Sequence, residues 1–139
     1  MSEPEAGFEI LEHTADVGVR SWGPSLEEAF RQSTLGLLDI IGVWRPGTGE
    51  RISIEVEGRD PGALLVDWLS EVLYLQEVRD PVITAIEISS VQEGRAAGWV
   101  EVAQRPRDIE GTAVKAITFH QLDVSRTEEG WSTTVFVDI

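Results

Sequence analysis

The sequence lacks cysteine altogether and has one lysine, two histidines and one tyrosine among its 139 residues. Without cysteine there is no disulfide framework, no thiolate metal site and no cysteine nucleophile. No apolar run approaches the roughly 20 residues that span a bilayer, and residues 1–7 lack the basic and apolar regions of a signal peptide. We therefore expect a cytoplasmic protein with no membrane segment.

Basic residues are scarce, and this scarcity is the strongest global constraint. Twenty-five acids against eleven bases give a net charge of −14 and a pI near 4.4. A protein that grips nucleic acid needs a basic surface to displace counterions, so we expect no direct binding of RNA or DNA. A basic protein partner or a divalent cation suits this charge better, although solubility or a salt-adapted host would also explain it.

The hydrophobic pattern predicts two helices and about six or seven strands. Ser25 and Glu28 have the spacing of a capping box, and Asp60-Pro61 is a typical helix start. We predict helices over residues 25–41 and 60–79, and strands over 8–13, 17–22, 51–57, 82–92, 96–104, 117–125 and 131–138. The last four strands form two hairpins. The uneven distribution predicts an α+β fold, with two helices packed on antiparallel or mixed β-sheets in a sandwich.

We expect residues 1–139 to form a single domain, with residues 1–7 as a flexible acidic N-terminus. There are no internal repeats, low-complexity tracts or linkers. The chain is long enough to bury about two thirds of its unfolded surface in one core.

Carboxylates near the two ends of the chain are the first functional candidates. Asp16 lies on a predicted bend, three residues after His13, and we expect Gly18 to allow backbone geometry that a side chain would forbid. Asp138 and the main-chain carboxylate of Ile139 end an apolar strand that we expect to stay packed to its end. If the bend meets this end, three negative groups converge and need a cation or a base between them.

Such a set of hard oxygen donors favours calcium or magnesium over zinc. We place calcium first, with magnesium or manganese as alternatives. Lys115 is the natural counter-charge, and His13 and His120 are candidates for orienting the carboxylates. No Ser-His-Asp arrangement or phosphate-cradling glycine loop is recognisable, so no residue is assigned a catalytic role in isolation.

Four segments carry a family resemblance. They are His-Thr-Ala-Asp-Val-Gly at 13–18, Asp-Trp-Leu-Ser-Glu-Val-Leu-Tyr at 67–74, Lys-Ala-Ile-Thr-Phe-His at 115–120, and the final Val-Asp-Ile. In this order, over nearly the whole chain, they resemble the archease family. The sequence departs from the family pattern in Gln76-Glu77-Val78, where an aromatic and an acidic residue are frequent, and at Phe119, where tyrosine is common.

The resemblance implies an archease-like sandwich and a non-enzymatic role as activator of an RtcB-type RNA ligase in tRNA splicing or RNA repair. Archease proteins promote guanylylation of the ligase's active-site histidine, sustain its turnover and broaden the nucleoside triphosphates it accepts. The family's metal site maps onto Asp16, Asp138 and Ile139, and its functionally important lysine onto Lys115.

Two alternatives remain at this point. The first is a stand-alone metal-dependent phosphohydrolase. The second is a general protein chaperone or adaptor that binds clients through a helical face. Turnover without a ligase would indicate the hydrolase. Stimulation that is unchanged by alanine at Asp16 and Asp138 would indicate the chaperone.

Overall fold

A computed structural model describes residues 5–12, 16–107 and 111–139 of the chain. The elements are β1 (Gly7–Glu12), β2 (Asp16–Gly23), α1 (Leu26–Ile41), β3 (Glu50–Glu57), α2 (Pro61–Arg79), β4 (Val82–Gln92), β5 (Arg95–Ala103), β6 (Ala116–Thr127) and β7 (Gly130–Asp138). Each predicted helix and strand is present, within one or two residues of its predicted ends. The α+β class is confirmed.

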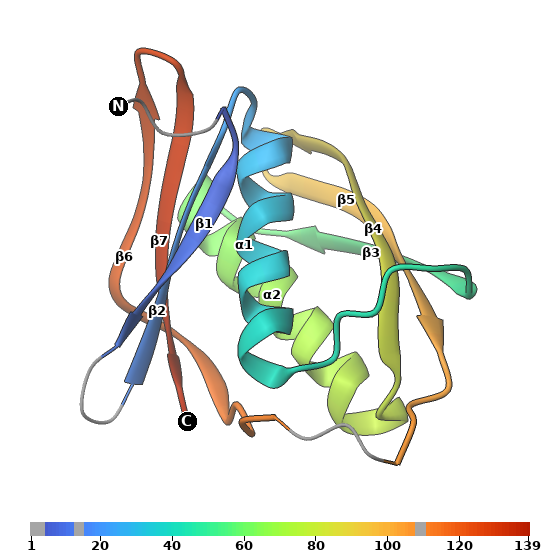
Figure 1. Ribbon diagram of the computed structural model, residues 1–139. Helices are drawn as coiled ribbons and strands as arrows, with labels where there is room; N and C mark the ends of the chain where they lie inside the picture. Colours follow the sequence, from blue (N-terminus) through green and yellow to red (C-terminus); the bar gives the residue numbers. More distant parts are fainter. Residues whose placement is uncertain (1–4, 13–15, 108–110) are drawn as a thin grey trace.

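Two antiparallel sheets enclose the two helices in three layers (Figure 1). The four-stranded sheet has the order β1-β2-β7-β6, and the three-stranded sheet has the order β3-β5-β4. Helix α1 packs on β2 of the first sheet and β4 of the second, and α2 packs on β6 and β3. Both helices are therefore shared between the sheets, and neither sheet has a separate core.

The helix ends follow the predicted capping chemistry. The Ser25 side chain accepts a hydrogen bond from the Glu28 backbone N–H at 3.1 Å, and Asp60 accepts one from the Ala63 N–H at 2.8 Å. Gly42 ends α1 at φ 85°, a left-handed conformation that suits glycine. Within the described residues, no helix has the length and apolarity needed to cross a membrane.

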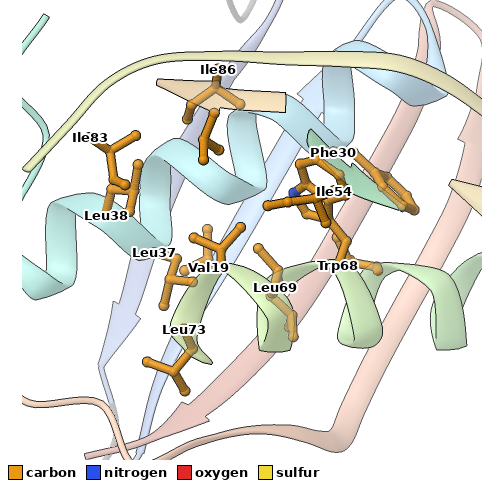
Figure 2. Close-up of a cluster of buried hydrophobic side chains, with 14 of the residues drawn as sticks. Val19, Phe30, Leu37, Leu38, Ile54, Trp68, Leu69, Leu73, Ile83 and Ile86 are labelled. Atoms are coloured by element: carbon orange, nitrogen blue, oxygen red, sulfur yellow. The ribbon is translucent and has the colours of Figure 1, made fainter. Parts of the chain in front are cut away.

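The core lies between the sheets and draws side chains from both helices (Figure 2). Its labelled members are Val19, Phe30, Leu37, Leu38, Ile54, Trp68, Leu69, Leu73, Ile83 and Ile86. Two buried polar contacts accompany the apolar core: Trp68 Nε1 donates to Thr34 Oγ1 at 3.0 Å, and Thr34 Oγ1 donates to the Phe30 carbonyl at 2.8 Å. The hydrogen bond between Trp68 and Thr34 joins α2 to α1.

Strand β7 lies between β2 and β6, so the last strand joins the first hairpin to the last one. In this register Val17 pairs with Val137 and Val19 with Val135, and all four side chains are buried. Because side chains alternate across a strand, these valines fix which residues face away from the helices.

Strand β6 is less regular than its sequence predicted. Thr118 lies opposite Phe136 but Asp123 lies opposite Thr134, so residues 119–122 of β6 face a single residue of β7. Gln121 has a positive φ of 52°, and Phe119 is 63% exposed. Residues 119–122 therefore form a bulge in this edge strand, and β6 does not continue as a flat strand.

Candidate functional site

Asp16 and Asp138 lie directly opposite each other, at the first residue of β2 and the last residue of β7. Directly opposed residues of an antiparallel pair point to the same side of the sheet, with Cβ atoms about 5 Å apart. Because Val17 and Val137 point to the helices, both carboxylates lie on the outer face. The predicted meeting of the early bend and the chain end is confirmed for these two residues.

Lys115 lies at the same end of the sheet. Its backbone N–H donates to the Asp138 carbonyl at 2.8 Å, and the next residue, Ala116, pairs with Asp138 across the strands. Asp138 is therefore held on both sides, by β2 and by the start of β6. The Lys115 side chain is exposed, and its backbone is hydrogen-bonded to the residue that carries one of the two carboxylates.

Gly18 supports the site for a different reason from the one expected. Its backbone is not in the left-handed region, so conformational freedom does not explain the glycine. A Cβ there would lie 2.7 Å from Cε2 of Phe136 and 3.1 Å from the Leu11 Cβ. Glycine is needed because the Phe136 ring lies directly on the backbone of β2.

The two histidines have different outcomes. His13 lies outside the described residues. His120, on the β6 bulge, contacts the Phe136 ring edge-on with centroids 6.1 Å apart, and its backbone N–H donates to Thr118 Oγ1 at 3.2 Å. Thr118 in turn donates to the Phe136 carbonyl at 2.9 Å. His120 is thus linked to the strand that carries Asp138 through Phe136.

Ile139 lines a small cavity of about 300 Å³ together with Val17, Ile40 and two acids, Glu12 and Asp39, and neither Asp16 nor Asp138 is among its lining residues. Neither acid was among the site residues predicted from the sequence. Asp39 carried a signal, because an acid in the last turn of a helix faces the negative end of the helix dipole and is unfavourable there. Helix stability therefore does not explain the presence of an acid at position 39.

The donor set fits a hard divalent cation. Two carboxylates on directly opposed residues repel each other unless a positive group lies between them, and the Ile139 main chain continues from one of them. No group of three or more His, Cys, Asp or Glu side chains able to hold a metal is present in the described parts of the chain. A cation here would therefore need the Ile139 carboxylate, or water, to complete its ligands.

Comparison with known proteins places this geometry in a family. Residues 8–139 match the model of the Archease protein family (MTH1598/TM1083). The chain is 32% identical to the protein archease of Methanosarcina barkeri, with all of both chains covered. It is 38% identical to the protein archease of Saccharolobus islandicus, over 95% of this chain and 98% of the relative.

Two solved structures share the fold. The solution structure of Methanobacterium thermoautotrophicum protein 1598 aligns with a TM-score of 0.75 at 26% identity, covering 96% of this chain and 99% of that one. The crystal structure of a Thermotoga maritima archease, described as a possible chaperone, aligns with a TM-score of 0.62 at 22% identity, covering 100% and 98%. Because the family model matches residues 8–139, which are nearly the whole chain, this chain belongs to the archease family.

Proposed function

We propose that this chain is an accessory protein that activates an RtcB-type RNA ligase by promoting guanylylation of the ligase's active-site histidine and its turnover. In this proposal it acts through a divalent cation that Asp16, Asp138 and the main-chain carboxylate of Ile139 hold. Calcium is the first candidate for this cation. Membership of the archease family supports the accessory role.

One observation carries the proposal: the direct pairing of Asp16 with Asp138 across β2 and β7. These strands are fixed by buried valines, so the two carboxylates are held close together whatever their own repulsion. A protein keeps such an arrangement when a cation or a partner neutralises it.

The carboxylates and the lysine have different roles in this proposal. Asp16 and Asp138 present negative oxygen atoms on the outer face of the sheet, and the exposed ammonium of Lys115 can reach a phosphate or a carboxylate as a compact point charge. A bound cation would supply charge neutralisation for a triphosphate. The acidic surface favours a partner that itself binds RNA and is therefore basic.

The test is a time course of ligase guanylylation at limiting metal, with and without this protein. Asp16→Ala, Asp138→Ala and Lys115→Ala should each reduce the stimulated rate at least tenfold. Asp123→Ala is the matched control, because Asp123 is an exposed acid on the same sheet that faces Thr134 rather than another acid. Full stimulation by all three site variants would refute the proposal.

A chaperone or adaptor role is the second candidate, and it rests on a different surface. Tyr74 and Val78 lie one turn apart on α2, are 62% and 63% exposed, and line a cavity of about 280 Å³ with Ile52 of β3. Exposed apolar side chains of this kind mark contact surfaces. If this surface carries the function, Tyr74→Ser with Val78→Ser abolishes stimulation, whereas Asp16→Ala leaves it intact.

A further inference from the structure

An open cavity lies at the far end of the three-stranded sheet from the β4–β5 turn, and it is lined by arginines. It measures about 760 Å³ and forms where α2 and β5 end and β3 begins. Arg79, Arg105 and Arg107 all line it, from the end of α2 and from the segment after β5. Its volume is within the roughly 300–1,000 Å³ of small-molecule sites.

The charge of this cavity is opposite to that of the molecule. Three of the ten arginines gather here with two acids, Glu50 and Asp80, so the charged lining residues sum to +1 in a chain of −14. A positive concave surface in an acidic protein concentrates anions locally, because low-dielectric walls focus the field. Nothing in the ligase-activating site requires these arginines.

The two acids hold the arginines without neutralising them firmly. Arg79 Nη2 lies 2.6 Å from Glu50 Oε2, and Arg105 Nη1 lies 2.6 Å from Asp80 Oδ1. The acid side chains are 65% and 68% exposed, and ion pairs this open contribute little because solvent screens them. A multiply charged anion can therefore displace the carboxylates.

Arg105 is the best-positioned of the three arginines. Its side chain is only 23% exposed, so it is oriented before any ligand arrives, and Arg107 is exposed two residues later. Guanidinium groups stay charged at all physiological pH values and bind phosphate oxygens in pairs. Several arginines arranged around one open cavity suit an anion with more than one phosphate group.

We propose that this arginine pocket binds a compact oligophosphate, either free or as the phosphate chain of a nucleotide. The binding is a property of this chain alone and does not depend on the ligase or on the carboxylate pair. Failure of one proposal therefore leaves the other standing.

The test is calorimetric titration of the full chain with sodium tripolyphosphate at low salt, in buffer stripped of divalent cations. Saturable one-to-one binding that weakens as salt is added is expected. Arg105→Gln with Arg107→Gln should weaken binding at least tenfold, and Arg107→Gln alone, at an exposed position, should weaken it measurably in a folded chain. Arg59→Gln with Arg95→Gln is the matched control, because it removes the same charge from exposed residues outside the pocket.

The outcomes separate the ligand sources. A nucleoside triphosphate that binds more tightly than tripolyphosphate assigns the pocket to nucleotides, and one that binds equally or more weakly assigns it to free oligophosphate. The proposal is overturned by the absence of saturable binding, by equal losses in the pocket and control variants, or by equal binding of an uncharged nucleoside.

Discussion

At the residue scale, the candidate site depends on packing more than on its own interactions. Val17 pairs with Val137 and Val19 with Val135, and these buried pairs leave Asp16 and Asp138 opposed on the outer face. A one-residue slip of β2 against β7 would turn every valine outward, so the core prevents the carboxylates from separating. The strand register imposes their repulsion.

This repulsion has a measurable consequence. In buffer free of divalent cations, Asp16→Asn should raise the free energy of unfolding by about 0.2–1 kcal/mol, because it removes one of two like charges on directly opposed residues. Chemical denaturation measures the change. Asp123→Asn, whose cross-strand neighbour is Thr134, should leave the value unchanged, and an equal gain in both variants would show that net charge alone is responsible.

Gly18 allows a second test at this scale. Gly18→Ala places a methyl group 2.7 Å from the Phe136 ring, so the strand or the ring must move. Overpacking of this kind costs about 1–3 kcal/mol, which should lower the melting temperature by several degrees.

Gly47→Ala is the matched control for that change. The nearest heavy atom to a Cβ at Gly47 is 3.9 Å away, so there is room for the methyl group. Its effect on the free energy of unfolding should lie within about 0.5 kcal/mol of zero. A Gly18→Ala melting temperature equal to that of the wild type would contradict the close contact with Phe136.

At the element scale, helix α1 is fixed on the four-stranded sheet by buried polar contacts as well as by its apolar face. Ser21 Oγ of β2 donates to the Ala29 carbonyl at 2.9 Å and shares a hydrogen bond with Thr133 Oγ1 of β7. All three residues are fully buried. This contact joins the helix to the two strands that carry the carboxylate pair.

The Ser21 and Thr133 hydroxyls should be energetically coupled, because they share a buried hydrogen bond that either single change breaks. Ser21→Ala leaves the Thr133 hydroxyl buried without its partner and should destabilise the chain by about 1–3 kcal/mol. Ser21→Ala combined with Thr133→Val removes both hydroxyls, so its cost should be well below the sum of the two single changes. Urea denaturation of the three variants measures this, and strict additivity would contradict the coupling.

The elements were predictable from sequence because their signals are local. Ser25 and Asp60 cap the helices as their spacing predicts, and the alternation of Ile52, Ile54 and Val56 predicts β3. The strand order was not predictable, because pairing of β2 with β7 joins residues more than a hundred positions apart. No local pattern specifies such a pairing.

The proximity of Asp16 and Asp138 was predictable, but the packing that supports it was not. Crowded negative groups near the chain end indicated Asp16 and Asp138, and the resemblance to archease supplied Lys115 as a functional residue. The bulge at residues 119–122 and the Phe136 ring on Gly18 depend on packing between strands, so the alternation within β6 could not reveal them. The arginine pocket likewise forms only when the ends of α2 and β5 meet the start of β3.

At the scale of the whole molecule, the three-layer sandwich places the start of β2 beside the C-terminal end of β7. Strand β7 lies between β2 and β6, in the sheet that covers one side of the two helices (Figure 1). The net charge of −14 makes the surface electronegative overall, and the carboxylate pair adds two opposed charges to it. This concentration of negative charge is what motivates the proposed cation or basic partner at this end.

Calcium titration of the full chain, followed by calorimetry, tests the central claim most directly. Two glycines added after Ile139 move the main-chain carboxylate away from Asp138 and leave every side chain unchanged, and two glycines added at the N-terminus are the control. We expect the wild-type chain to bind one calcium ion. The C-terminal extension should weaken this binding at least tenfold, and Asp138→Asn should weaken it as well. The N-terminal extension should leave it unchanged. Equal calcium binding by all four proteins would contradict this expectation.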